Sequence, residues 1–128
     1  MATIKSFTSL EQSKKLAEIL PLESADMFIA DVINSKEQIH SYAFHILTTW
    51  GCKTFAEIKE RESNHIKFIP CWTLSALLCV LGEGYSLRNR KGKFYVRITH
   101  IYHEILLFDN PVDACVDMII KLKEADLL

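Results

Sequence analysis

PCWTLSALLCVLG, residues 70–82, is the stretch that decides the fold of this chain. Almost every residue between its proline and its glycine is apolar or small. Pro70 suits the first turn of a helix, and Gly82 suits the position just beyond the last turn. A helix that is apolar on all sides is buried on most of them. The stretch therefore predicts a central helix in which Trp72 and Leu77 are deeply buried.

A second strongly patterned helix is predicted at DNPVDACVDMIIKLKEADLL, residues 109–128. Asn110 is a favourable N-cap, and Pro111 is a favourable first helical residue. Acidic residues come early and lysines late, as the helix dipole prefers. Such a helix is a packing element first, although a partner-binding arm has the same pattern. Its apolar stripe has helical spacing and consists of Val112, Cys115, Val116, Ile119 and Leu122.

Two more helical segments are predicted by their starting residues. TSLEQSKKLAEIL, residues 8–20, has apolar residues on one broad face and ends at a proline. TFAEIKERES, residues 54–63, predicts only a charged helical turn or two. Each begins with a threonine followed three residues later by a glutamate, the pattern of a capping box. These pairs are Thr8–Glu11 and Thr54–Glu57.

The other apolar segments predict strands. ADMFIADVI is ambiguous, but its β-branched and aromatic residues favour a strand over a helix. HSYAFHILTTW alternates with the period of a strand. YSLRNRKGKFYVRIT predicts a hairpin whose turn lies near Asn89–Gly92, where Gly92 supplies a positive φ. In order, the predicted strand segments are 25–33, 40–50, a short edge strand at 64–69, the hairpin at 85–99, and a third antiparallel strand at 100–108.

These elements predict an α+β fold. We expect a small antiparallel sheet of about three to five strands, with helices packed on one face. The chain has 128 residues, with 49% apolar and 24% charged side chains, which suits one globular domain over 1–128. No repeat, low-complexity tract or linker divides it.

The charge and hydropathy of the chain exclude several classes of partner. The net charge of −1 attracts neither nucleic acid nor acidic lipid as a whole, so any electrostatic function requires a local patch. No apolar run approaches the length of a membrane span, and we expect no membrane partner. The first residues, MATIKSFTSLEQSKK, lack the apolar core of a secretory signal, which predicts a cytoplasmic protein.

The cysteines and histidines do not predict a metal site or another cofactor. The four cysteines have no CxxC spacing, and we interpret them as buried, inert thiols. His100 and His103 form an H-x-x-H pattern, but in a strand these side chains point to opposite faces. His40 and His45 fail in the same way.

No motif identifies a catalytic residue. Cys71 is the only thiol for which reactivity is predicted, because the dipole of a helix beginning at residue 70 would lower its pKa. Asp113 and Asp117 lie one turn apart on the last helix, where a solvated face explains them. Glycine-rich phosphate-binding motifs are missing from the sequence.

One local patch of positive charge falls on the predicted hairpin. Its cations would contact phosphates, and the interleaved rings of Tyr85, Phe94 and Tyr95 would stack on bases. The same charges also protect an edge strand from aggregation, and we favour this simpler interpretation. The five basic residues are Arg88, Arg90, Lys91, Lys93 and Arg97.

Three segments carry a resemblance to a known family. They are SLEQSKKLAEILPLESADMF, PCWTLSALLCVL and DNPVDACVDMIIKLKEADLL. Together they resemble small uncharacterised proteins encoded in bacteria of the Bacteroides group and in their phages and mobile elements. The resemblance covers both ends and the central helix, and is much weaker over residues 31–69. It implies a cytoplasmic protein of phage or mobile-element type, and it implies no activity, cofactor or functional residue.

Three functional hypotheses follow, in order of preference. The first is a non-enzymatic interaction protein that binds itself as a homodimer or another protein, through the last helix or a sheet edge. The second is a nucleic-acid accessory protein that uses the basic hairpin. The third is an enzyme with Cys71 as its nucleophile.

Overall fold

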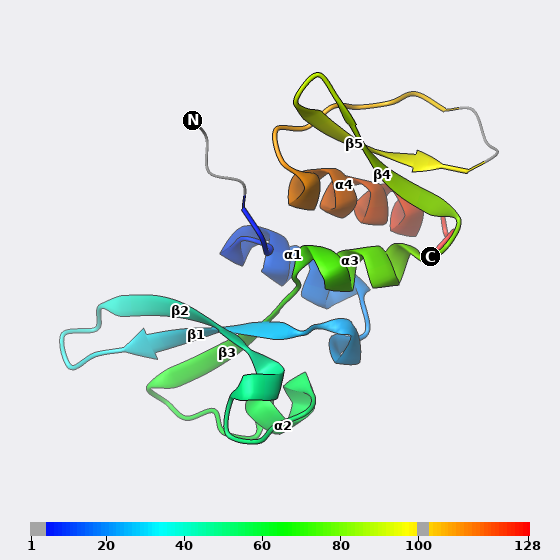
Figure 1. The fold of residues 1–128 in the computed structure, drawn as a ribbon. Helices are drawn as coiled ribbons and strands as arrows, with labels where there is room; N and C mark the ends of the chain where they lie inside the picture. Colours follow the sequence, from blue (N-terminus) through cyan, green and yellow to red (C-terminus); the bar gives the residue numbers. More distant parts are fainter. Residues whose placement is uncertain (1–4, 100–102) are drawn as a thin grey trace.

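The structure is a computed structural model that describes residues 5–99 and 103–128. A helical layer separates a three-stranded sheet from a two-stranded hairpin (Figure 1). The α+β class is therefore confirmed, with the strands divided between two sheets. The helices are α1 (Leu10–Ile19), α2 (Phe55–Lys59), α3 (Leu74–Leu81) and α4 (Pro111–Glu124), with short 3-10 turns at Leu22–Ser24 and Ile46–Thr48. The strands are β1 (Met27–Ile33), β2 (Ile39–His45), β3 (Ile66–Cys71), β4 (Tyr85–Arg90) and β5 (Lys93–Ile98).

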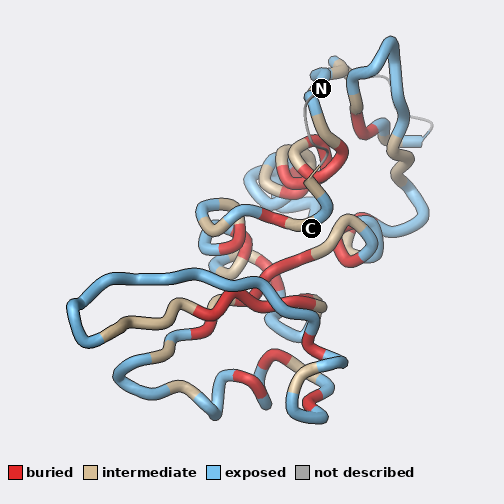
Figure 2. The backbone as a smooth tube through the Cα atoms, turned by 60° about the vertical axis from the view of Figure 1, so that its left-hand side comes forward, coloured by how far each residue is buried: buried red, intermediate tan, exposed pale blue. Residues whose placement is uncertain are grey.

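The three-stranded sheet is antiparallel, with β1 between β2 and β3. Successive residues of β1 point to opposite faces and join two separate apolar clusters. Met27 and Ile29 face α1 and pack with Cys71. Phe28 and Ala30 face the other way and pack with a cluster that includes Phe55 and Ile58 of α2. The part of the sheet near α1 and α2 is therefore covered on both faces, and its buried residues are red in Figure 2.

The main core lies in the helical layer. It joins Leu16 of α1, Leu77 of α3, Val96 of β5 and Ile119 of α4 around Trp72. Trp72 and Leu77 are both 0% exposed, which confirms their predicted burial. The whole apolar stripe of α4 is buried, and Asn110 caps this helix by accepting a hydrogen bond from the backbone of Asp113. The last helix is thus a packing element, as its pattern predicts.

The central stretch is helical over less of its length than predicted. Pro70 and Cys71 belong to β3, and the helix begins only at Leu74. The cause is Thr73, which accepts a hydrogen bond from Ala76 N as the N-cap, while its own N–H donates to Asp26 Oδ1 at 2.9 Å. A capping residue with extended backbone angles ends the strand and starts the helix. Gly82 does end the helix, with φ of 80°.

The helix is also less deeply buried than a fully apolar sequence predicts. Leu78 is 37% exposed, and Cys79 is exposed as well. The prediction of a buried thiol at Cys79 is therefore wrong. Apolar composition alone does not show which side of a short helix its neighbours cover.

The capping residue of α1 differs by one position from the predicted one. Ser9 accepts a hydrogen bond from Gln12 N at 3.2 Å, and Gln12 Oε1 accepts one from Ser9 N at 3.0 Å. This is a complete capping box, moved by one residue from the predicted Thr8–Glu11 pair. Thr8 is fully buried instead. Thr54 does cap α2, because its hydroxyl accepts from Glu57 N.

The hairpin is confirmed, but the third strand beside it is not. Lys91 and Gly92 turn the chain with φ of 52° and 84°. Residues 100–102 lie outside the described structure, and residues 103–108 form only an isolated bridge between Phe108 and Phe94. The His103 ring accepts the N–H of Ile98 at 2.9 Å, so a side chain occupies a donor that strand pairing would need. Within the described ranges, no helix has the length and apolarity needed to cross a membrane.

Candidate functional site

The basic residues of the hairpin gather on one face. Residues directly opposite each other on an antiparallel pair share a face. Arg88 lies opposite Tyr95, Arg90 opposite Lys93, and Ser86 opposite Arg97. The other face carries Leu87, Phe94 and Val96, which join the main core beside α4. We call the outward set, together with the exposed turn residue, the basic face: Arg88, Arg90, Lys91, Lys93 and Arg97.

Two of these cations already have an acidic or aromatic partner within the chain. Lys93 forms an ion pair with Asp109, and the Arg90 guanidinium lies 5.2 Å from the centre of the Tyr95 ring. Tyr95 is only 8% exposed, although it lies on the outward face. Tyr85 and Phe94 belong to the inward face. The hairpin therefore presents cations for phosphate groups, but no open ring on which a base would stack.

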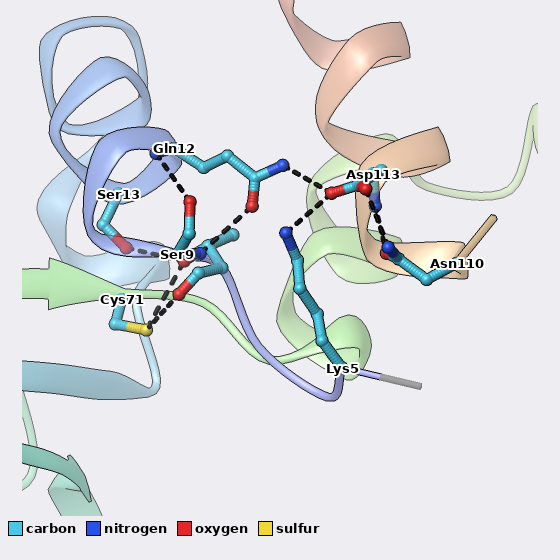
Figure 3. A network of polar contacts seen from close by, with 8 residues as sticks. Lys5, Ser9, Gln12, Ser13, Cys71, Asn110 and Asp113 are labelled. Carbon is cyan, nitrogen blue, oxygen red and sulfur yellow. Dashed lines mark hydrogen bonds and ion pairs between the residues drawn. The ribbon is translucent and has the colours of Figure 1, made fainter. Parts of the chain in front are cut away.

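Cys71 is a structural residue rather than a reactive one. It is 0% exposed and lies at the end of β3 against the start of α1, as Figure 3 shows. Its thiol donates to the backbone oxygen of Thr8 at 3.4 Å, and the Thr8 hydroxyl lies 2.7 Å from that of Ser13. Burial raises the pKa of Cys71 and outweighs the hydrogen bonds that lower it. The predicted lowering of its pKa is wrong, because Cys71 ends a strand and does not start a helix.

The other thiols divide into two kinds. Cys52 and Cys115 are buried, as predicted, and burial raises the pKa of Cys115 to about 11. Cys79 is exposed on α3. Only a deprotonated, accessible thiol is nucleophilic. The buried pair therefore belongs to the packing of the molecule.

The remaining candidate residues have separate, local partners. His40 and His45 lie on opposite faces of β2, and His100 lies outside the described residues. Asp113 accepts hydrogen bonds from Lys5 and Gln12 at 2.7 Å each, which ties α4 to the start of α1 (Figure 3). Burial raises the pKa of Asp113, but its hydrogen bonds with Lys5, Gln12 and Asn110 outweigh this and lower it overall. Over residues 5–99 and 103–128, no three His, Cys, Asp or Glu side chains gather as metal ligands would.

The structure shows an apolar surface that sequence reasoning missed. It is a groove of about 450 Å³ on the face of the three-stranded sheet that points away from α1. Tyr42 is 53% exposed, Phe44 45% and Trp50 56%. We call this surface the aromatic groove, and its main lining residues are Phe28, Val32, Tyr42, Phe44, Trp50 and Phe68.

Ring contacts hold the aromatic groove in shape. Phe28 stacks on Phe44 with 5.5 Å between ring centres, and the edge of Phe68 meets Phe28 at 5.4 Å. Trp50 lies 6.0 Å from Phe68, and the Arg61 guanidinium lies 5.1 Å from the centre of the Trp50 ring. Such contacts fix rings at separations that aromatic pairs favour. The groove is thus preformed, with its outer rings half in water.

One signal in the sequence marks this surface. Tyr42 and Phe44 alternate with Ser41 and Ala43, which places both rings on one face of β2. The pattern does not show whether that face is covered, and all seven residues of β2 are in fact exposed. Comparisons of the chain with protein-family models, with curated proteins and with solved structures gave no match.

Proposed function

We propose that this protein is a non-enzymatic interaction protein that binds a polypeptide partner through the aromatic groove and the adjoining strand β2. The observation that carries the proposal is the exposure of Tyr42, Phe44 and Trp50 in one preformed groove. Contiguous exposed apolar surface marks interaction sites, and large aromatic side chains are enriched at them. The apolar stripe of α4 is buried, so a sheet edge is the better candidate of the two surfaces expected from the sequence.

The resemblance of the chain ends and the central helix to small proteins of Bacteroides-group bacteria and their phages and mobile elements supports a setting for this function. We place the protein in the cytoplasm of such a cell, as an accessory component of a phage or mobile element. A binding role suits the geometry better than catalysis at Cys71, because that thiol is 0% exposed and its pKa is raised.

Photo-crosslinking inside a bacterial cell tests this function. A photoreactive phenylalanine analogue replaces Phe44 in the groove, and the control carries it at Leu107, which lies outside the groove and has the same 45% exposure. We expect irradiation to join a polypeptide to position 44 and none to position 107. A chain that remains free after irradiation at both positions would contradict the proposal.

A second candidate function is the binding of nucleic acid by the basic face. One observation favours this function: side chains alternate along each strand, which brings four cations to one side of the hairpin. They are Arg88, Arg90, Lys93 and Arg97. Arg90 and Lys93 lie directly opposite each other, and such like-charge pairs destabilise a hairpin. Asp109 already offsets part of this repulsion through its ion pair with Lys93, and a phosphate backbone would offset more of it.

Salt-dependent binding to short DNA and RNA duplexes and single strands tests this second function. If about four phosphates are contacted, log K falls with log salt at a slope of roughly −3 to −4. Arg88→Glu with Arg97→Glu should abolish binding, since neither arginine has an acidic partner on the hairpin. Lys14→Glu with Lys15→Glu on α1 changes the net charge equally and should leave binding intact. No binding by the unaltered chain at low salt would end this candidate.

A further inference from the structure

The two edges of the three-stranded sheet differ in how their backbone groups are used. On the side of the sheet that β3 occupies, the N–H of Ile33 in β1 donates to the backbone oxygen of His65, just before β3, at 2.8 Å. This hydrogen bond fixes which residue pairs along β1 and β3 are hydrogen-bonded. Hydrogen-bonded pairs alternate along an antiparallel ladder, so Lys67 and Ile69 also bond inward to β1. The backbone groups that point outward from this edge belong to Ile66, Phe68 and Pro70.

All three outward positions of β3 are protected. Ile66 exchanges backbone hydrogen bonds with Ser63, and the N–H of Phe68 donates to the Glu62 carboxylate at 3.2 Å. Pro70 has no N–H to offer. Proline and charged side chains are among the devices by which proteins prevent an edge from pairing with another chain. This edge is closed to a further strand.

No residue in the described ranges protects the edge formed by β2 in this way. Asn34 N donates to Gln38 O at 3.0 Å, and Ile46 N donates to Asp26 O at 3.1 Å, which fixes the phase of this ladder in the same way. His40, Tyr42 and Phe44 therefore bond inward to β1. The outward backbone groups belong to Ile39, Ser41, Ala43 and His45.

Most of these outward groups have no partner in the part of the chain that the structure describes. Only the backbone oxygen of His45 accepts hydrogen bonds, from the hydroxyls of Thr48 and Thr49. Residues 39–45 contain no proline, lysine, arginine, aspartate or glutamate. The strand is a ready template for another strand, and it lies beside a groove that would hold apolar side chains.

We infer that the partner at this edge is a second copy of the chain, paired antiparallel through β2 about a two-fold axis at Tyr42. This assignment rests on the proposed interaction function and names its partner. In this register each Ser41 lies opposite the other copy's Ala43, and the two exchange both of their outward backbone hydrogen bonds. Tyr42 then lies opposite its own copy in a non-hydrogen-bonded pair, where side chains approach most closely.

The charges and faces of β2 favour self-pairing over another partner. The strand carries no formal charge, so two copies bring no like charges into opposition, and a charged peptide would gain no ion pair from it. Residues that lie opposite each other across the axis project from the same face of the combined sheet. Phe44 therefore lies opposite the other copy's His40, on the face that carries the groove. The two aromatic grooves thus become neighbours on one six-stranded sheet, with the strand order β3-β1-β2-β2-β1-β3.

Sedimentation equilibrium of the whole chain is the first test. We expect a mass twice that of the 14.7 kDa chain at micromolar to sub-millimolar concentration. Ala43→Pro removes one outward N–H while sparing the ladder to β1, and it should return the mass to that of one chain. Ser41→Ala keeps every backbone group and should remain dimeric.

Disulfide trapping then tests the register. In a Cys79→Ser background, which removes the exposed thiol, Tyr42→Cys should give a disulfide-linked dimer on mild oxidation. Non-hydrogen-bonded pairs lie within the Cα separation that a disulfide spans. Ser41→Cys should stay unlinked, because its own copy is not opposite it in this register.

The possible results separate this inference from the broader function. A chain that stays monomeric at all concentrations, or that links through position 41 in place of 42, overturns the two-fold pairing at Tyr42. A monomer whose Phe44 position still crosslinks to a different protein overturns the dimer and leaves the interaction function standing. A dimer linked through position 42 supports both.

Discussion

The two sheets of this molecule each pack one face on the helical layer, and they differ in what they present outward. The hairpin β4–β5 presents cations, among them Arg88 and Arg97. The three-stranded sheet presents half-exposed rings, among them Tyr42 and Trp50. Charged groups are stable in water without a partner, whereas exposed aromatic surface is stabilised when another apolar surface covers it. Water already solvates the outward face of the hairpin, whereas the larger sheet presents an apolar surface suited to a partner.

The strongest test of this comparison is whether both sheets depend on one core. Trp72 lies where β3 meets α3, and its indole N–H donates to Ser24 Oγ at 2.9 Å. Trp72→Ala should lower the free energy of unfolding by about 3–5 kcal/mol, a large share of a small domain's stability. Urea unfolding, followed by circular dichroism and by the fluorescence of Trp50, measures this loss and shows whether the transitions coincide. A loss below about 1 kcal/mol would show that the two sheets do not share this support.

A matched pair of phenylalanines sharpens the contrast within the aromatic groove. Phe28 and Phe44 are register partners whose rings stack, but Phe28 is 1% exposed and Phe44 45%. Phe28→Ala should cost about 3–5 kcal/mol of unfolding free energy. Phe44→Ala should cost about 1 kcal/mol in the monomer, because much of its ring is already in water. Equal losses in chemical denaturation at low protein concentration would mean that the outer rings are structural.

Asp113 ties α4, which packs on the hairpin, to α1, which packs on the three-stranded sheet, and it predicts a smaller, pH-dependent effect. Its pKa is lowered in the folded protein, so its contribution to stability is present at neutral pH and is lost as the pH falls through the folded pKa. Asp113→Asn should reduce stability by up to about 1 kcal/mol at neutral pH, since the carboxylate is partly exposed. The difference between the two proteins should shrink below about pH 4, near the ordinary pKa of an aspartate. Urea unfolding midpoints of both proteins, measured from neutral pH to below pH 4, test this prediction. A stability difference that does not change with pH would argue against the contribution of the Asp113 carboxylate.

Thiol labelling compares the two regions without changing their stability. Cys79 should react at the rate of a free peptide thiol, because it is exposed. Cys71 reports on the three-stranded sheet and Cys115 on the helical core, and both should react more slowly by a factor of about 100 or more, since each needs an opening of the fold. Mass spectrometry of labelled peptides gives each rate. Fast labelling of Cys71 alone would show that the sheet with the aromatic groove opens independently.

Local chemistry in the sequence predicts much of this fold. Asn110 and Pro111 mark the start of α4, and the alternation around Gly92 marks the hairpin, because caps and turns depend on neighbouring residues. The predicted start of α3 is wrong because the true start depends on Asp26, a residue distant in sequence that accepts a hydrogen bond from the Thr73 N–H. The predicted third strand is absent from residues 103–108 for a similar reason, since the His103 ring accepts the backbone N–H of Ile98 that a neighbouring strand would need.

The candidate sites show the same limit. The five basic residues were visible as a run of charge, and alternation places four of them on one face. The aromatic groove was not visible, because Trp50 reaches it from outside any strand and because burial depends on what α2 does and does not cover. Whether a side chain is exposed depends on how the layers pack together, and the residue pattern of a single strand does not predict it.

The main core also determines when this protein can become stable during its synthesis. Leu16, Trp72 and Leu122 share one apolar cluster, although they are far apart along the chain. The ribosome must therefore release α4 before α1 and α3 gain their last apolar neighbour. Until then the apolar faces of α1 and α3 are incompletely covered, and a nascent chain in this condition is open to chaperones and to premature association.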